Sequence, residues 1–315
     1  MSNLECHDSA YQDHRGRHVL ISANPKSGSK SRLHLVEELR SRIEARGFIC
    51  ELYTQLEPMS KRAFELVGTN HLRTVVAAGG DGTAATVASL IPEKTPLTLF
   101  PVGSENLLAR YLSVQADPEQ CASLIEGMSI KTMDAMMVNG KLTLLMASVG
   151  FDAEVVRRVH SSRRSHITRW TYWKSIISTL ATYRWRDIQL DVLDGQDRLV
   201  QRHIGNWVFV FNVPRYAAGL RIIDDARDDD GQLDIGIFGS GGMVAGIRNY
   251  LAVLSRSHKK SSDWVRLNAT SVRITSGNDN SPALTCQTDG DWASDLPITI
   301  HSLPHRIRVL VNPKA

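Results

Sequence analysis

The chain has 315 residues, enough for two domains that each bury a hydrophobic core. A hydrophobic content of 42% and a charged content of 22% are ordinary for a soluble globular protein, and the net charge of +4 favours an anionic surface without indicating nucleic acid. The cysteines are scattered without a Cys-x-x-Cys pair, which indicates neither a zinc site nor a disulfide framework and fits a reducing cytoplasm. No apolar run approaches the roughly 20 residues of a spanning helix, so we expect any membrane contact to be peripheral.

The first predicted elements follow a polar stretch, residues 1–17, which has no apolar signal core and is expected to be a flexible tail. His18–Ala23 is predicted to be a buried strand that runs into the Gly- and Ser-rich turn Asn24–Lys30 and then into helical periodicity. This turn lacks the spacing of a Walker loop. A second strand over Phe48–Tyr53 and an amphipathic helix over about Pro58–Val67 follow.

The stretch around which the first half is organised begins with a β-branched apolar run, Thr74–Ala78, and continues through Gly79, Gly80, Asp81, Gly82 and Thr83 into a small-residue helix. A strand that ends in glycines and opens a helix presents backbone N–H groups at a positive dipole end, which suits phosphate binding. A carboxylate at Asp81 suits a hydrogen bond to a ribose or base, or a bridging cation or water. The alternative is a Gly-Asp-Gly turn chosen only for chain reversal.

A further strand, Leu97–Pro101, is followed by Val102–Tyr111 and helical spacing. Strands that alternate with helices predict a parallel sheet with ligands at the carboxyl ends of its strands. The edges after Ala23, Ala78 and Pro101 are all rich in Gly, Ser and Asn. Residues 18–130 are therefore predicted to form an α/β domain that binds a ligand at these edges.

From residue 131 onward the pattern is that of β-strands separated by turn signals such as Asn139-Gly140 and Asp230-Gly231. We predict an antiparallel β-sandwich over 131–315, with helical inserts at about 167–183 and 242–254, and with a last strand that is free to return to the first domain. The strands are expected at 141–148, 187–193, 203–213, 233–238, 271–275, 298–301 and 306–311.

Six short motifs in order carry a resemblance to a known family: Asn24-Pro25-x-Ser27-Gly28, Gly79–Thr83, Pro101–Asn106, Gly150–Glu154, Asp229–Asp234 and Asp289–Asp291. Over roughly Val19–Ile300 the chain resembles the diacylglycerol kinase catalytic-domain superfamily, closest to the bacterial lipid kinases and related to sphingosine and ceramide kinases and, more distantly, to NAD kinases. The resemblance implies a Rossmann-like N-terminal domain, a β-sandwich C-terminal domain, and ATP with Mg²⁺ as cofactors.

The resemblance also implies the nucleotide-binding residues. Beside Gly79–Thr83, with Asp81 counted among the catalytic residues as well, the polar contacts would be Asn24, Ser27, Thr54, Ser104 and Asn106. For Ser104 and Asn106 the alternative is helix capping. The chain departs from the family pattern at Glu105 and Leu107.

Asp289-Gly290-Asp291 is the candidate catalytic pair. A lipid hydroxyl that attacks the γ-phosphate benefits from a carboxylate that accepts its proton. The family normally reads Asp-Gly-Glu, with the Glu as general base, so Asp291 stands in that place with one methylene fewer. Asp289 is expected to be a metal ligand or an alternative base. The alternative reading of the pair is an Asp-Gly turn between strands.

By resemblance, the acidic turn Asp228–Asp234 holds a structural Mg²⁺ through the Asp230 carboxylate and the backbone carbonyls near Arg227 and Gln232; a solvated acidic hairpin is the alternative. Glu154 matches a position where sphingosine kinases place an acidic residue against the substrate head, or is a surface carboxylate that opens a helix.

Arg157–Lys174 interleaves basic residues with Trp170, Tyr172 and Trp173, which fits an interfacial helix on an anionic membrane, although core aromatics with solvated arginines are the alternative. The sequence thus predicts a cytoplasmic kinase, peripheral to the membrane, that phosphorylates a lipid hydroxyl. A weakly active nucleotide-binding module and a soluble kinase of the NAD kinase type are the alternatives. No nucleic acid partner is expected, and a homodimer is left open.

Overall fold

The computed structural model describes residues 16–23, 33–161, 169–215, 222–277 and 284–313. The chain forms two compact units, one of Met1–Thr132 with Ile307–Ala315 and one of Met133–Arg306. The last strand, β16 (Ile298–Leu310), therefore begins in the second unit and ends in the first. The domain limits predicted from the sequence, 18–130 and 131–315, stay a prediction.

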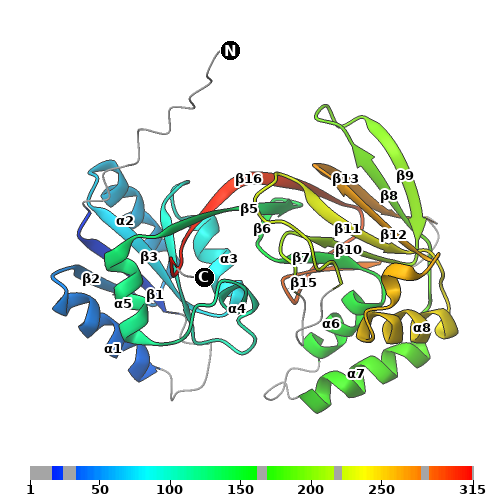
Figure 1. The fold of residues 1–315 in the computed structure, drawn as a ribbon, viewed down its shortest axis with the longest axis horizontal. Coiled ribbons are helices and arrows are strands. Elements are labelled where there is room, and N and C mark those ends of the chain that lie inside the picture. Colours follow the sequence, from blue (N-terminus) through cyan, green and yellow to red (C-terminus); the bar gives the residue numbers. More distant parts are fainter. Residues whose placement is uncertain (1–15, 24–32, 162–168, 216–221, 278–283, 314–315) are drawn as a thin grey trace. The chain divides into compact units, whose positions relative to one another are not determined.

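The first unit is built on the parallel strand order β2-β1-β3-β4, and Arg308 and Val309 of β16 extend this sheet beside β4. Helices α1 and α5 pack together on one face, and α2 and α3 pack together on the other (Figure 1). The elements are β1 His18–Ala23, α1 Leu33–Ala45, β2 Ile49–Tyr53, α2 Leu56–Gly68, β3 Leu72–Gly79, α3 Asp81–Leu90, β4 Pro96–Pro101, α4 Leu107–Tyr111 and α5 Pro118–Gly127. The predicted Rossmann-like α/β fold is confirmed.

The central strand β3 is buried from Thr74 to Gly79, as its apolar run predicts for a strand covered on both faces. The polar side chain of this buried stretch is satisfied inside the sheet, because the Thr74 hydroxyl lies 2.8 Å from the carbonyl oxygen of Pro96 and 2.9 Å from the Thr98 hydroxyl. The strand therefore holds the Gly-rich turn that follows it on a rigid base.

The second unit is a sandwich of two sheets. One contains β5, β6, β8, β9, β13 and the first part of β16; the other has the order β12-β11-β10-β7-β14-β15. Buried apolar residues of both sheets form one core, with Val149 and Val210 on one side and Val272 and Ile300 on the other. The strands are β5 Ile130–Val138, β6 Lys141–Thr143, β7 Met146–Val149, β8 Ile188–Leu193, β9 Leu199–Gly205, β10 Trp207–Phe211, β11 Leu233–Phe238, β12 Trp264–Ala269, β13 Ser271–Ser276, β14 Thr285–Thr288 and β15 Asp291–Asp295. The predicted antiparallel β-sandwich is confirmed.

Helices α6 (Phe151–Ser161), α7 (Arg169–Thr182) and α8 (Met243–Leu254) lie on the outer side of the second sheet (Figure 1). Helix α6 contacts β7, β14 and β15, and α7 contacts both α6 and α8. Among the described residues, no helix combines the length and the apolar character that crossing a bilayer requires.

Several strand limits differ from the expectation. The run 141–148 is two strands, β6 and β7, because the amides of Leu144, Leu145 and Met146 turn away to a side chain of another loop. The run 203–213 is broken at Asn206, and 298–301 and 306–311 are one continuous strand. Strands β5, β12, β14 and β15 were not anticipated, and helix α6 corresponds to the alternative in which Glu154 opens a helix.

Candidate functional site

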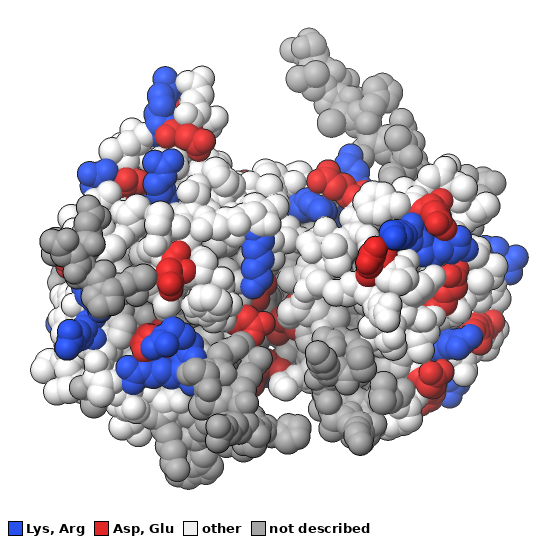
Figure 2. Space-filling view, turned by 180° about the vertical axis from the view of Figure 1, so that it is seen from behind, with Lys and Arg blue, Asp and Glu red and all other residues white. Residues whose placement is uncertain are grey.

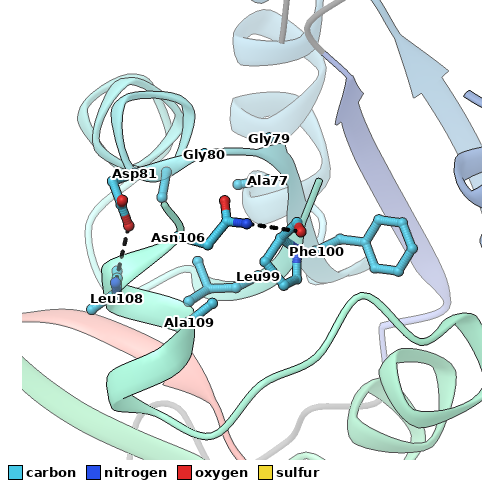
Figure 3. A pocket seen from close by; sticks show the side chains of 11 residues that line it. Ala77, Gly79, Gly80, Asp81, Leu99, Phe100, Asn106, Leu108 and Ala109 are labelled. Carbon is cyan, nitrogen blue, oxygen red and sulfur yellow. Dashed lines mark hydrogen bonds between the residues drawn. The ribbon is translucent and has the colours of Figure 1, made fainter. Parts of the chain in front are cut away.

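The loops after β3 and β4 meet at the carboxyl edge of the first sheet. The Gly103 amide donates to the carbonyl oxygen of Gly79 at 3.3 Å, and a Cβ on Gly103 would lie 2.4 Å from the Gly80 Cα atom. A side chain at residue 103 would therefore clash with the main chain of Gly80, which explains the glycine there. The glycines predicted for phosphate binding in one loop therefore lie beside the Pro101–Asn106 loop, as two of the three predicted edges require (Figure 3).

Asp81 joins these two loops. Its carboxylate oxygens accept hydrogen bonds of 2.9 Å from the amides of Leu107 and Leu108, the first residues of α4 (Figure 3). Burial raises the pKa of the Asp81 carboxyl, and the two amide bonds act in the opposite direction. The side chain thus caps a helix of the neighbouring loop, a role that the sequence analysis did not consider for it.

Helix α3 begins directly after these glycines without a side-chain cap, since its N-cap residue is Gly80. The first amides of an α-helix have no acceptor inside the helix, and the dipole adds positive charge at this end. A Cβ on Gly79 would lie 2.2 Å from Thr83 Oγ1, so the loop also packs tightly onto its own helix. The arrangement is suited to binding an anion with main-chain amides.

Asn106 occupies the N-cap position of α4 in a left-handed conformation, with φ of 50°. Its side-chain amide donates to the carbonyl oxygens of Pro101 (3.1 Å) and Gly103 (3.0 Å), so it shapes the loop instead of capping the helix. Among the described residues its Oδ1 atom is buried without a hydrogen-bond donor. It borders a cavity of about 10 Å³, room for one water molecule and no more.

Of the remaining predicted nucleotide contacts, Ser104 lies in the same loop as Gly103 and Asn106, whereas Thr54 follows a different strand. Thr54, which follows β2, and Ser104 are both exposed. Asn24 and Ser27 lie outside the described residues. The first unit therefore brings together Gly79–Thr83 with Ser104 and Asn106, and the contribution of the turn after β1 stays a prediction.

In the second unit, Asp289 and Gly290 form the two-residue turn between β14 and β15, with φ of 51° and 84°. Positive φ at both residues is the type I′ geometry that favours Asp-Gly in hairpins. The Asp289 carboxylate accepts hydrogen bonds of 2.9, 2.9 and 3.0 Å from the amides of Leu144, Leu145 and Met146. Through these bonds Asp289 holds the connection between β6 and β7 in place.

A buried network of hydrogen-bonded polar side chains supports the same turn. The Trp207 indole donates to Asp152 at 2.7 Å, and the Ser148 hydroxyl donates to Asp152 at 2.5 Å. The Gln287 side chain donates to Ser148 at 2.8 Å and accepts from the Gly290 amide at 2.9 Å. Gln287 and Ser148 were not predicted from the sequence, because single polar residues inside apolar strands do not form a recognisable motif.

Asp291 is the first residue of β15, and its side chain is half-buried beside this fixed turn. It pairs with Thr288 across the hairpin, and Lys141 donates to the Thr288 hydroxyl at 3.0 Å. A carboxylate and an ammonium group thus flank the end of the hairpin.

The acidic turn after residue 227 is closed by hydrogen bonds between its own groups. The Asp230 Oδ1 atom accepts from the Gln232 amide at 3.0 Å, and the Arg227 amide donates to Asp234 at 3.0 Å. Within the described residues, no group of three or more His, Cys, Asp and Glu side chains is placed to hold a metal ion. The ligand set implied by the sequence has a single carboxylate, so it stays a prediction.

Glu154 lies on α6 and binds two arginines. Arg157 donates to it through Nε and Nη2, both at 2.7 Å, and Arg158 through Nε at 2.7 Å. Burial works to raise the pKa of Glu154, but the hydrogen bonds from Arg157 and Arg158 outweigh it and lower the pKa. The residue borders a cavity of about 600 Å³ whose wall includes Arg184 and Arg186, two residues that the sequence analysis did not single out.

Comparison with known proteins agrees with this geometry. Residues 18–138 match the diacylglycerol kinase catalytic domain, and residues 146–311 match the YegS C-terminal NAD kinase beta sandwich-like domain. A diacylglycerol kinase of Mycobacterium tuberculosis is 24% identical over 300 residues, which cover 93% of this chain and 94% of that protein.

Two solved structures share the fold. A diacylglycerol kinase from Bacillus anthracis superposes with a TM-score of 0.66 at 18% identity, over 95% of this chain and 98% of that one. The yeast NADH kinase complexed with NADH superposes with a TM-score of 0.50 at 12% identity, over 95% and 84% of the two chains. With two family domains in the expected order and Gly-rich loops meeting at the sheet edge, the chain belongs to the diacylglycerol kinase and YegS family of lipid kinases.

Proposed function

We propose that the protein transfers the γ-phosphate of ATP, with Mg²⁺, to a hydroxyl group of a membrane lipid of the diacylglycerol type. The observation that carries the proposal is the main-chain contact between Gly80 and Gly103 at the uncapped start of α3. Side chains are absent where the phosphates would approach, and the amides of the first turn of α3 supply the hydrogen-bond donors. Membership of a lipid kinase family supports the acceptor class.

The proposed division of labour follows from the contacts. The loop amides hold the nucleotide phosphates, and the Asp81 carboxylate keeps the two loops in register by capping α4. Asp291 accepts the proton of the attacking hydroxyl, and Asp289 and Gln287 fix the turn from which it projects. Asp291 is one methylene shorter than the Glu of the family pattern, so its placement depends on this rigid turn.

Hard oxygen ligands are the preferred partners of Mg²⁺. At the acidic turn, the Asp230 Oδ1 atom accepts from the Gln232 amide, and the described residues donate no hydrogen bond to its Oδ2 atom, which we propose as a ligand of the ion. Mg²⁺ bound with ATP would neutralise the charge of the transferring phosphoryl group.

We propose α8 as the membrane-contacting helix, in place of the segment Arg157–Lys174 that the sequence pattern indicates. The side chains of Trp170, Tyr172 and Trp173 lie outside the described residues. Helix α8, in contrast, exposes an apolar face: Val244 is 79% exposed and Leu251 is 55% exposed, with Met243, Ile247 and Leu254 beside them. Arg256 and Lys260 follow the helix as exposed cations. Apolar residues with cations at one end fit the interface of an anionic membrane.

The charges on one face of the molecule do not favour a nucleic acid partner there. On the face shown in Figure 2, Lys and Arg side chains alternate with Asp and Glu over the described residues, without a continuous basic stripe. Nucleic-acid-binding proteins usually gather their basic residues on one face.

The test is transfer of label from [γ-³²P]ATP. Purified protein is incubated with Mg²⁺ and, in separate reactions, with diacylglycerol in mixed micelles, with other hydroxyl lipids, and with NAD. Labelled lipid supports the proposal. A labelled dinucleotide would instead favour the NAD kinase type, and ATP binding without transfer to any acceptor would favour the weakly active module.

A further inference from the structure

The second unit contains a polar cavity of about 600 Å³ between α6, the segment that follows α7, and the β14–β15 hairpin. Its wall carries Arg157, Arg158, Arg184 and Arg186, against two carboxylates, Glu154 and Asp295. Four guanidinium groups and two carboxylates leave two positive charges in the cavity. A volume of this size holds a small ligand or the head of a lipid.

Two of the arginines are held in place. Glu154 binds Arg157 through a bidentate pair at 2.7 Å and Arg158 through one bond at 2.7 Å, and Arg158 also donates to the Thr182 hydroxyl at 2.8 Å. The bidentate pair uses Nε and Nη2 of Arg157, so its Nη1 group remains as a donor. Glu154 therefore fixes the orientation of both guanidinium groups before any ligand arrives, which lowers the entropic cost of binding.

Arg184 differs from these two. It is exposed, and the described residues provide it with no hydrogen bond or ion pair. Since no described residue binds its guanidinium group, a ligand at this wall can reach Arg184 without breaking a bond that the described residues make.

The wall residue Tyr183 is held by aromatic packing behind it. Tyr183 stacks edge-on against Trp185 with ring centroids 5.1 Å apart, and Phe151 stacks on Trp185 at 5.7 Å. A Cβ on Gly246 of α8 would lie 2.2 Å from the Trp185 ring, so the indole is pressed against that helix. The Tyr183 hydroxyl is buried and has no hydrogen-bond partner among the described residues. A hydrogen-bonding ligand or water at this wall would remove that cost.

We propose that this cavity binds a phosphomonoester, the chemical class of the product that a lipid kinase releases. A phosphomonoester carries about −1.5 to −2 charges at pH 7, which balances the two positive charges of the wall, whereas a phosphodiester carries about −1 and a diacylglycerol head none. The planar guanidinium group of arginine donates paired hydrogen bonds to two oxygens of a phosphate group, which a single hydroxyl cannot accept. Calling this ligand the reaction product rests on the proposed function, whereas the proposal that the cavity binds a phosphomonoester does not.

The experiment measures binding by isothermal titration calorimetry on the full chain without ATP. The ligands are dihexanoyl phosphatidic acid, dihexanoyl phosphatidylglycerol, dihexanoylglycerol and inorganic phosphate. We expect phosphatidic acid to bind at least about tenfold more tightly than the diester lipid, and the neutral lipid to bind weakest. Arg184→Gln should weaken phosphatidic acid binding about tenfold, the effect of losing one charged hydrogen bond.

Arg198→Gln is the matched control, since Arg198 is an exposed arginine of the same unit that pairs with Asp194 and does not border the cavity. It should leave the affinity unchanged. Inorganic phosphate that binds as tightly as phosphatidic acid would support the phosphate site and assign it to soluble phosphomonoesters. Equal affinity of the wild type and Arg184→Gln, a preference for the neutral lipid, or no binding of any phosphomonoester would overturn the proposal. A protein that binds phosphatidic acid but transfers no label in the kinase assay would contradict the proposed function and leave the site intact.

Discussion

Two of the Asp-Gly pairs in the chain, Asp81-Gly82 and Asp289-Gly290, use their carboxylates in the same way. Asp81, at the start of α3, accepts the amides of Leu107 and Leu108, and Asp289, in the β14–β15 hairpin, accepts those of Leu144, Leu145 and Met146. In each unit an acidic motif residue holds a neighbouring loop. A carboxylate inside a motif is therefore not by itself a sign that it touches the substrate.

What the two turns present differs. The first leaves bare main chain at the uncapped N-terminus of a helix, which suits an anion. The second presents the side chain of Asp291 at the start of an edge strand. We therefore propose that the first unit binds its ligand with backbone amides and that the second acts with side chains. The following changes test this proposal.

Asp291→Asn should have the largest effect on turnover, a fall of about 10²–10⁴-fold, because an amide cannot accept the proton of the attacking hydroxyl. Asp289→Asn is the comparison: it should lower thermal stability more than Asp291→Asn does, since it disturbs three amide bonds. Label transfer and thermal melts of both variants measure the difference. Full turnover in Asp291→Asn would reverse the assignment of the two acids.

Asp81→Ala should lower turnover about a hundredfold, as expected for loops that shift by about 1 Å, and should cost about 1–2 kcal/mol of stability for the lost cap. Asp117→Ala is the matched control, because Asp117 caps α5 of the same unit with bonds of 2.8 and 3.0 Å to the amides of Glu119 and Gln120. The control should lose similar stability and keep its activity. If both variants lose activity equally, the role of Asp81 is only that of a cap.

Gly103→Ala should weaken ATP binding about tenfold and cost about 1–3 kcal/mol, because its Cβ would meet the main chain at Gly80 and push the loops apart. Gly127→Ala, at the end of α5, has nothing within 4 Å of the added carbon. That control should leave nucleotide binding unchanged. Titration with a fluorescent ATP analogue and chemical denaturation provide the two readouts.

Val244→Glu should reduce partition onto vesicles that contain anionic phospholipids by about tenfold, since it places a charge in the apolar face of α8. Val200→Glu on β9 is the control, at a valine that is 66% exposed on another element. Vesicle co-sedimentation separates the two. An equal loss in both variants would mean that α8 has no special part in the contact.

Glu154→Gln should show the smallest effect, one that depends on pH. The pKa of Glu154 is lowered in the folded state, so its ionised form adds stability above the ordinary value of 4.5 and loses this contribution as the pH falls through the lower folded value. The difference in melting temperature between wild type and variant should therefore be constant near neutral pH and shrink below 4.5. A difference that grows on acidification would contradict the stabilising role of the ion pairs that Glu154 makes with Arg157 and Arg158.

The α/β and sandwich classes were predictable because strand periodicity and turn residues act locally. The Asn139-Gly140 hairpin is an example, with positive φ at both residues as the dipeptide predicts. The roles of Asp81 and Asp289 were not predictable, because their partners lie 26 or more residues away in sequence and are backbone amides, which leave no trace in the residue pattern. The cavity arginines were missed for a similar reason, since Arg184 and Arg186 become neighbours of Arg157 only through the packing of α7 on α6.

The exposed face of α8 carried a signal that was available but not used. Met243, Val244, Ile247, Leu251 and Leu254 recur at helical spacing, which the sequence analysis took for an ordinary helical insert. Periodicity predicts that these apolar side chains share one face of the helix, but it does not predict whether the rest of the protein covers that face. Only the packed structure distinguishes a core-facing stripe from one that is left open.

The central claim is that the main chain of Gly79–Thr83 binds the nucleotide phosphates. It is tested most directly by following backbone amide resonances of the ¹⁵N-labelled protein as a non-hydrolysable ATP analogue and Mg²⁺ are added. We expect the amides of Gly80, Asp81, Gly82 and Gly103 to shift with a single dissociation constant, while those of the β8–β9 hairpin stay in place. Saturable binding of the analogue with no movement of the Gly80–Gly82 amides would contradict the account.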